Sequence, residues 1–339
     1  MPQVARFIRM DYRTGLVNQQ KAPDEAMIET RGLTRVFGAV RAVDGLDLRI
    51  ERGEIFGLVG PDGAGKTTTL RLLAAIMDPT AGSARVAGFD TRRQAEAIKH
   101  HIGYMSQQFS LYGDLSVWEN LNFFADVFGV RGRARAERLA RLLDFANLRP
   151  FRDRRAMHLS GGMQKKLALA CTLAHQPEIV LLDEPTTGVD PVSRREFWDI
   201  LAELHIAGAT IVVSTPYMDE AERCTRVGLL HRGRLIVCDT PERIQTMVEG
   251  ELIALRPANA LRAAAELAGA PGVRETQVYG DLVHVFVDDA GARLPDIARC
   301  LDGAGIPFTD LQRERPRMEQ AFISLISRQT SEARADGQQ

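Results

Sequence analysis

The feature that most constrains this chain is the run GPDGAGKT at residues 60–67, which fits the pattern G-x-x-x-x-G-K-[ST]. An apolar strand is predicted directly before it, from Ile55 to Val59. A helix is predicted from Lys66 onward, where leucines recur at helical spacing as far as Ile76. A strand, a glycine loop and a helix in that order predict a phosphate-binding loop in an α/β fold.

The glycines let successive backbone N–H groups turn inward around phosphate oxygens, and the helix N-terminus adds partial positive charge. Lys66 is expected to bridge the β- and γ-phosphates of a nucleotide, and the Thr67 hydroxyl is expected to bind Mg²⁺. The residues of this loop and first helical turn expected to contact the nucleotide are Gly60, Asp62, Gly63, Ala64, Gly65, Lys66, Thr67 and Thr68.

Two consecutive carboxylates follow a second buried strand, predicted from Ile179 to Leu182. Asp183 is expected to hold Mg²⁺, directly or through water, and Glu184 to polarise the attacking water as general base. Taken alone, the pair could be an acidic turn before Pro185. Together with the phosphate loop, it predicts nucleotide hydrolysis.

Length and charge exclude several classes of protein. A chain of 339 residues favours two domains, and 43 Lys and Arg against 44 Asp and Glu leave a net charge of −1. That balance disfavours a basic nucleic-acid-coating protein and a disordered acidic chain. The apolar runs are far shorter than the ~20 residues of a membrane helix. The four cysteines form no CxxC pair and suit a reducing cytosol.

Changes of pattern along the chain predict its domain organisation. Residues 1–26 show no sustained period and are expected to form a mobile extension. Residues 27–245 alternate short strands with helices and are expected to form one α/β ATPase domain, with a helical insertion at about 108–172. Residues 250–328 are expected to form a C-terminal regulatory or dimerisation domain, and 329–339 a disordered tail.

The C-terminal region has the order β-α-β-β-α-β with a closing helix, which predicts a small α+β, ferredoxin-like domain. It carries no cluster of catalytic residue types, and His284, alone on a strand, is expected to serve packing. The predicted strands are 251–256, 273–279, 281–288 and 307–313, and the predicted helices are 258–269, 293–304 and 316–328.

A third motif brings in a family. The run LSGGMQ at 159–164 begins its Ser-Gly-Gly 94 residues after Lys66 and 23 residues before Asp183. Together with LLDEPTTGVDP at 181–191, it resembles the ATP-binding subunits of ABC transporters, over roughly Met27 to Glu242. The resemblance implies ATP and Mg²⁺, and a P-loop NTPase with a RecA-like core, an antiparallel β subdomain and a helical insertion.

In that family the LSGGMQ segment, here called the signature, closes on the nucleotide of a second ATPase subunit. Hydroxyl and N–H groups at a helix start make a phosphate-binding surface, although a Ser-Gly-Gly run could also be only a helix cap. The resemblance therefore implies a head-to-tail homo- or heterodimer. The signature residues assigned to nucleotide binding are Ser160, Gly161, Gly162 and Gln164.

Other positions are carried over one at a time. Phe37 matches the aromatic residue that stacks on adenine, although a lone Phe in a strand is often core. Gln107 matches the glutamine that senses Mg²⁺ and the γ-phosphate, with Gln108 as the adjacent alternative. Asp190 matches the aspartate that couples the two sites of a dimer. The implied catalytic group is thus Lys66, Gln107 and Glu184, and the implied metal group is Thr67, Gln107 and Asp183.

Two positions depart from the family. Asp62 stands where Asn is more usual, and an acidic group beside phosphates is unfavourable unless it faces solvent or a partner. Pro216 stands where a histidine usually contacts the γ-phosphate, and proline has no donor to offer. The substitution predicts a slow ATPase as a purified subunit. The alternative is that Thr215 or Tyr217 supplies the missing donor.

Seven of the 21 aromatic residues lie between residues 104 and 128. Phe123, Phe124 and Phe128 are expected to form the core of the helical insertion. The run 131–155, with nine arginines and a local charge of +6, is expected to be a solvated face, with anionic lipid or a partner subunit as the alternative. The resemblance assigns a groove for a short helix of a membrane subunit to Phe109, Leu111 and Tyr112.

The segments PTTGVDP and STPYMDEAE are most similar to those of ATPases of ABC-2-type exporters, the group that includes drug-efflux ATPases. The resemblance implies an ATPase that powers export by a separate transmembrane permease. It also implies a peripheral location on the cytoplasmic side of the inner (plasma) membrane, and no nucleic-acid partner. The alternatives are a soluble ABC ATPase acting on the ribosome or DNA, and an ATP-binding regulatory subunit with weak hydrolysis.

Overall fold

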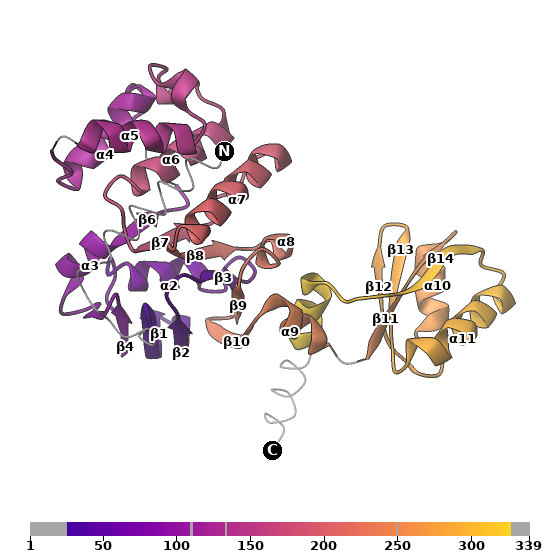
Figure 1. Cartoon of the computed structure of the whole chain (residues 1–339). Coiled ribbons are helices and arrows are strands. Elements are labelled where there is room, and N and C mark those ends of the chain that lie inside the picture. The colour runs from indigo at the N-terminus through magenta and orange to yellow at the C-terminus, as the bar shows by residue number, and fades with distance from the viewer. Residues whose placement is uncertain (1–25, 109–110, 133, 249, 327–339) are drawn as a thin grey trace. The chain divides into compact units, whose positions relative to one another are not determined.

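The computed structural model describes residues 26–108, 111–132, 134–248 and 250–326. The chain divides into two compact units, one through Cys238 and one from Asp239 (Figure 1). Phe109, residues 1–25 of the predicted extension and the predicted tail lie outside the described residues.

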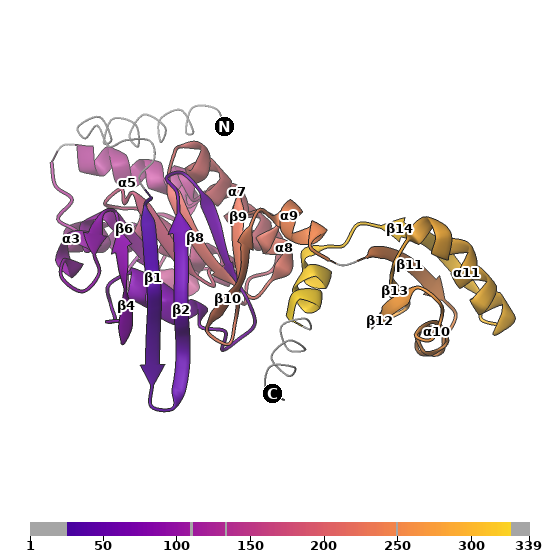
Figure 2. The ribbon, with the colours of Figure 1, turned by 90° about the horizontal axis from the view of Figure 1, so that it is seen from below.

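The first unit opens with a four-stranded antiparallel sheet in the order β2-β1-β4-β5. Strands β1 and β2 run side by side as a long hairpin, with Ile28 opposite Ile50 (Figure 2). Side chains alternate between faces of a strand, and the inward residues Val43, Leu46 and Leu48 of β2 are buried. The bounds are β1 Ile28–Phe37, β2 Val40–Ile50, β4 Ala81–Val86 and β5 Phe89–Asp90.

The second sheet has six strands in the order β10-β9-β3-β8-β7-β6, and the adjacent strands from β9 to β6 pair in parallel. Val59 of β3 lies opposite Thr215 of β8, and Asp183 of β7 lies opposite Ser214. The carboxyl ends of β3, β7 and β8 therefore meet at one edge, where ligands bind in such sheets. The strands are β3 Ile55–Val59, β6 Ile102–Met105, β7 Ile179–Asp183, β8 Thr210–Thr215, β9 Arg226–His231 and β10 Arg234–Asp239.

One helix of this core ends earlier than the sequence predicts. The helix after the phosphate loop ends at Leu73 rather than at Ile76, because Ala75 adopts a left-handed backbone with φ of 53°. Ile76 is consequently exposed. The core helices are α2 Lys66–Leu73, α3 Ala95–His101, α7 Pro191–Ile206 and α8 Met218–Ala221.

The helical insertion has a hydrophobic core of its own, in which Leu121, Leu139 and Leu167 are fully buried. Figure 1 shows α4, α5 and α6 gathered on one side of the parallel sheet. The prediction for Phe123 was wrong: its side chain is 37% exposed and makes an edge contact with Tyr112, whereas Phe124 and Phe128 pack against the core. The bounds are α4 Val117–Val127, α5 Ala134–Phe145, η1 Arg149–Phe151, η2 Ala156–His158 and α6 Gly161–Thr172.

The second unit is an antiparallel sheet in the order β12-β13-β11-β14 with helices packed on it. Its elements follow the predicted β-α-β-β-α-β order. His284 is buried and lies within hydrogen-bond distance of Gln320, as a packing role predicts. The elements are α9 Pro241–Thr246, β11 Glu251–Pro257, α10 Ala260–Leu267, β12 Val273–Tyr279, β13 Leu282–Val287, α11 Ala290–Gly303, β14 Phe308–Glu314 and a helix at 318–326.

Among the described residues, no helix has both the length and the apolar composition needed to cross a membrane.

Candidate nucleotide-binding site

The phosphate loop requires glycine at particular positions. Gly65 has φ of 104°, and a Cβ there would lie 2.2 Å from the carbonyl oxygen of Ala42. A Cβ on Gly60 would lie 2.2 Å from the carbonyl oxygen of Leu230. The backbones of β2 and β9 thus lie directly against the loop, and only glycine allows this close approach. Ala64 is buried, and Thr68 lies in the first turn of α2 beside Thr67.

Lys66 is held in the mouth of this loop although its side chain is buried. Its Nζ donates hydrogen bonds to the carbonyls of Gly60 (2.8 Å) and Pro61 (3.0 Å), and lies 3.2 Å from Oε1 of Glu184. The Asp62 side chain is 93% exposed, and its nearest oxygen is 4.0 Å from the same amine. The acidic departure from the family therefore faces outward from the loop.

Asp183 lies at the end of β7 with one satisfied and one unsatisfied oxygen. Its Oδ1 accepts hydrogen bonds from Thr67 Oγ1 (3.0 Å) and Ser214 Oγ (2.7 Å). Its Oδ2 is buried and has no hydrogen-bond partner among the described residues. Buried polar atoms are rarely left unpaired, and carboxylate and hydroxyl oxygens are the ligands that Mg²⁺ prefers. The pair of Thr67 and Asp183 fits a magnesium ion.

Glu184 has a left-handed backbone with φ of 46°, a conformation that costs energy in a residue other than glycine. Its backbone N–H is directed at both the carbonyl (3.1 Å) and the hydroxyl (3.0 Å) oxygens of Ser214. Its Oε2 accepts a hydrogen bond from Gln107 Nε2 at 2.9 Å. The carboxylate of the predicted general base is therefore held between Gln107 and Lys66.

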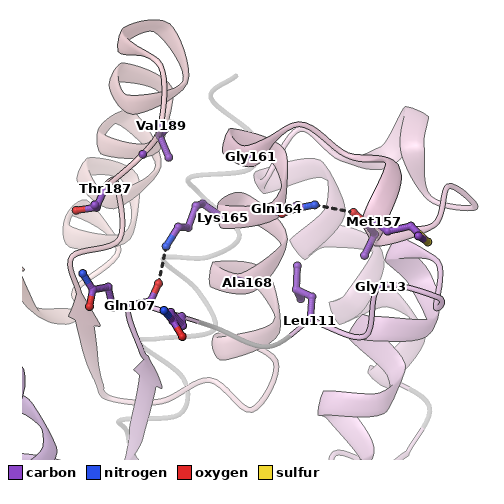
Figure 3. Close-up of a pocket in the computed structure, with 13 residues that line it drawn as sticks. Gln107, Leu111, Gly113, Met157, Gly161, Gln164, Lys165, Ala168, Thr187 and Val189 are labelled. Atoms are coloured by element: carbon purple, nitrogen blue, oxygen red, sulfur yellow. Dashed lines mark hydrogen bonds between the residues drawn. The ribbon is translucent and has the colours of Figure 1, made fainter.

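A cavity of about 500 Å³ lies beside Gln107, between α6 and the loop after β7. Figure 3 shows Lys165 extending from α6 toward Gln107, whose carbonyl oxygen accepts a hydrogen bond from its Nζ at 2.9 Å. Burial lowers the pKa of the Lys165 amine, and the negative charges of Asp183 and Glu184 oppose that shift. Lys165 therefore lies close enough to Asp183 and Glu184 for their charges to act on its amine.

The signature residues make local contacts in the single chain. Ser160 caps α6, because its hydroxyl accepts a hydrogen bond from the backbone N–H of Met163 at 3.3 Å. Gln164 donates to the carbonyl of Ala156, which holds the preceding turn. Gly161 is exposed, and Gly162 approaches Ser193 so closely that a Cβ would lie 2.4 Å away. Phosphate binding by this surface remains a prediction.

Phe37 and Asp190 occupy positions that suit, but do not by themselves establish, the roles carried over from the family. Phe37 is 42% exposed at the end of β1, so it is not a core residue, and the guanidinium of Arg35 lies 4.6 Å from its ring. Asp190 caps α7 by accepting hydrogen bonds from the N–H groups of Val192 (3.1 Å) and Ser193 (2.9 Å), which lower the pKa of its carboxyl.

Sequence reasoning missed three residues that the structure places around this site: Lys165, Ser214 and Glu220. The available signal was the pair of hydroxyl residues Ser214 and Thr215 at the end of β8, next to Pro216. The Thr215 hydroxyl donates to Glu220 Oε2 at 2.6 Å.

Comparisons with known proteins agree with this geometry. The family described as "ABC transporter" matches residues 43–187. The "Probable multidrug ABC transporter ATP-binding protein YbhF" of Escherichia coli (strain K12) is 45% identical over 223 residues, which are 66% of this chain and 39% of that protein. The chain thus matches less than half the length of that relative.

Full-length similarity comes from the "Nod factor export ATP-binding protein I" of Paraburkholderia xenovorans (strain LB400), which is 36% identical over 308 residues, 90% of this chain and 98% of that protein. A solved structure, "Dimeric Structure of MJ0796, a Bacterial ABC Transporter Cassette", aligns with a TM-score of 0.58 and 28% identity over 63% of this chain and 98% of that one. The resemblance predicted from the three motifs is confirmed. The chain belongs to the ATP-binding proteins of ABC transporters, close to the ATPases of ABC-2-type exporters.

Proposed function

We propose that this chain hydrolyses ATP to power export by a separate ABC-2-type transmembrane protein, on the cytoplasmic side of the inner membrane. The observation that carries the proposal is the position of Glu184, whose carboxylate lies between Lys66 and Gln107 at the edge where three parallel strands end. The names of two relatives, a probable multidrug ABC transporter protein and a Nod factor export protein, support export as the direction of transport.

Each residue of the site has a distinct task in this proposal. Thr67, Asp183 and Gln107 would hold Mg²⁺, which supplies positive charge to the β- and γ-phosphates. Glu184 accepts a proton from the attacking water. Lys66 binds the phosphates, so its ion pair with Glu184 must open when ATP arrives. The Phe37 ring, exposed at the end of β1, stacks on the adenine.

A second ATPase subunit completes the site in a head-to-tail dimer. Ser160, Gly161, Gly162 and Gln164 would bind the γ-phosphate held by the partner copy, and Asp190 would couple the two sites. The exposed faces of Ser160 and Gly161 support this, because neither is covered within the chain. The dimeric cassette to which the chain is similar also supports the arrangement.

The groove for the membrane subunit is proposed at Leu111 and Tyr112, shortly after Gln107 in the chain, with the ring of Phe123 beside Tyr112. The rings of Tyr112 and Phe123 are partly exposed and lie 4.5 Å apart, which offers an apolar surface to a short helix. Anchoring that helix near Gln107 would connect transport to the position of the general base, because Gln107 contacts Glu184 directly.

The C-terminal unit is proposed to be ferredoxin-like and to serve dimerisation or regulation. The strand order β12-β13-β11-β14 and the β-α-β-β-α-β element order support the fold assignment.

A second candidate function, an ATP-binding regulatory subunit with weak hydrolysis, is favoured by the end of β8. Pro216 offers no donor to a phosphate, and the Thr215 hydroxyl donates to Glu220 instead. The two functions differ in whether hydrolysis becomes fast when the membrane partner is present.

The experiment that separates them is co-expression with a candidate ABC-2-type membrane protein, sought in the reading frames next to this one, followed by measurement of ATP turnover in the purified complex. Transport function predicts that the two proteins copurify and that Glu184→Gln abolishes turnover, while the exposed Glu266→Gln, a matched control, does not. Copurification with ribosomes or DNA, or turnover that stays low in the complex, would contradict the proposal.

A further inference from the structure

Glu220 of α8 is a buried carboxylate, 1% exposed, to which no role has been assigned above. Its Oε1 accepts a hydrogen bond from Thr186 Oγ1 at 2.5 Å, and its Oε2 accepts one from Thr215 Oγ1 at 2.6 Å. Hydroxyl-to-carboxylate hydrogen bonds of this length are strong. Burying a carboxylate is costly unless it is well paired, and Nε of Arg194 lies 3.7 Å from Oε1 of Glu220.

The two threonines belong to two different segments of the site. Thr186 lies two residues after the proposed base Glu184, in the loop after β7. Thr215 ends β8, directly after Ser214, whose hydroxyl and carbonyl oxygens face the backbone N–H of Glu184. Glu220 therefore connects the loop that carries the base to the strand end that fixes the backbone of the base.

The backbone of Glu184 needs such support. Its φ of 46° is unfavourable for a residue with a side chain, and strain of this kind persists only where the surroundings enforce it. Ser214 fixes the N-terminal side of Glu184, and Glu220 fixes the following loop through Thr186. A shift on either side would move the carboxylate away from Gln107.

We propose that Glu220 is a positioning residue for ATP hydrolysis, which holds Glu184 in place through Thr186 and Thr215. The inference rests on the proposed ATPase function and adds a residue to it. The same contacts occupy the end of β8. The single hydroxyl proton of Thr215 is donated to Glu220, and its oxygen accepts the N–H of Tyr217 at 3.1 Å.

It follows that Thr215 does not replace the donor that Pro216 lacks. The ring of Tyr217 contacts the guanidinium of Arg194, which lies 4.4 Å from the ring centroid. Thr215 is thus held by Glu220 rather than directed at a phosphate.

The test compares four variants of the full chain, two of which, Thr215→Val and Thr215→Ser, form a matched pair. Thr215→Val removes the hydroxyl at nearly constant volume, and Thr215→Ser keeps it. Glu220→Gln keeps the shape but removes one acceptor, and Thr186→Val removes the other donor. We expect Thr215→Val, Thr186→Val and Glu220→Gln to lower kcat about 10- to 100-fold, the range for residues that orient a catalytic group. ATP affinity should stay within about twofold of the parent, and Thr215→Ser should restore kcat.

Hydrogen exchange without nucleotide gives a readout that does not depend on turnover. Glu220→Gln should accelerate exchange of the amides at 184–187 and 215–217, but not in β3. Unchanged exchange, or a parental kcat in Thr215→Val, would overturn the positioning role. Equal losses in ATP affinity, kcat and thermal stability, with no rescue by Thr215→Ser, would show a merely structural role and would also overturn it. Absence of turnover in the parent, alone and with its membrane partner, would instead overturn the proposed ATPase function.

Discussion

The two units of this chain differ in whether they bury charged side chains. Within the described residues of the second unit, the buried polar side chains are His284 and Gln320, and neither carries a formal charge when the histidine is neutral. The first unit instead buries five charged side chains, namely Lys66, Lys166, Asp183, Glu184 and Glu220.

Burying a charged side chain is unfavourable, and removing one partner of a buried ion pair is more unfavourable still. A fold therefore retains buried charges where they have a function. Four of the five buried charges gather at one edge of the parallel sheet or act on it through a hydrogen bond. The fifth, Lys166, is paired with Glu196 of α7. The comparison teaches that the first unit is organised around a reaction and the second around its own apolar core.

The sharpest way to break this comparison is to remove charges from the site. Lys66→Ala should abolish tight ATP binding, because the lysine provides charge to the bound phosphates. Glu184→Gln should keep binding and trap an ATP-bound dimer, because the glutamate acts only on the attacking water. Nucleotide affinity, turnover and gel filtration separate the two, with Lys99→Ala, on an exposed ion pair, as control. Parental hydrolysis by Glu184→Gln would mean that the general base is misassigned.

The next largest effect concerns the missing donor. Pro216→His should raise turnover of the isolated chain by up to ~10²-fold, by analogy with donors that stabilise transition-state charge. ATP affinity should change little. Steady-state kinetics of the two proteins measure this gain. Fast hydrolysis by the unmodified, isolated chain, with no gain in the variant, would show that the site needs no donor at this position.

Acid should affect the first unit through His175, which stacks on Phe128 with ring centroids 3.8 Å apart. Burial lowers the pKa of His175 to about 4, below its ordinary value of 6.5. The unfolded chain therefore binds a proton first as the pH falls, so stability is full above pH 6.5 and is lost below it. The loss at pH 5 should be about 2 kcal/mol.

Thermal unfolding at pH 7 and pH 5 measures that loss, and His175→Phe should reduce the dependence of the first unit on pH. Burial also lowers the pKa of His284, so acid should destabilise the second unit in the same direction. A first unit equally stable at both pH values would contradict the assignment of a neutral, half-buried His175.

A smaller effect is expected from the contact between α6 and Gln107. Lys165→Met should lower kcat about fivefold, the loss of roughly one hydrogen bond, because Gln107 would be less firmly held beside Glu184. Lys165→Arg preserves the charge and serves as the matched variant. Turnover at saturating ATP measures the effect, and a Met variant as active as the parent would show that the tether is unnecessary.

The smallest effect on the nucleotide site should come from removing the second unit altogether. A chain ending at Asp239, the last residue of β10, should bind ATP within about twofold of the parent, because the described nucleotide-site residues all precede that point. Dimerisation or transport should weaken. Circular dichroism shows whether the truncated chain is folded, and loss of ATP binding in a folded protein would contradict the division into two functions.

Local patterns predicted much of this molecule. The strand Ile55–Val59 has the predicted bounds, because an apolar run acts within a few residues. The positions of Lys66, Asp183 and Glu184 follow from motifs at the ends of strands that pair in parallel. What local pattern could not reveal depends on contacts between distant segments.

Glu220 illustrates the limit. In the sequence it is one of several acidic residues in DEAE, and only the approach of the loop after β7 makes it the partner of Thr186, 34 residues away. The prediction that Phe123 lies in the core failed for a related reason. Its helix buries Leu121 and Ala125 toward the core, and the phenylalanine falls on the other side, against Tyr112.

The ion pair between Lys66 and Glu184 determines the state of the site when no nucleotide is bound. Without a nucleotide, each group serves as the counter-ion of the other, so neither charge is left bare in a buried place. The arrival of a polyanion is then an exchange of counter-ions, in which the phosphates take the lysine and release the glutamate. A base that becomes available only when the phosphates displace it does not activate water in an empty site. In the proposed function, Lys66 thus both binds the phosphates of ATP and holds Glu184 inactive until they arrive.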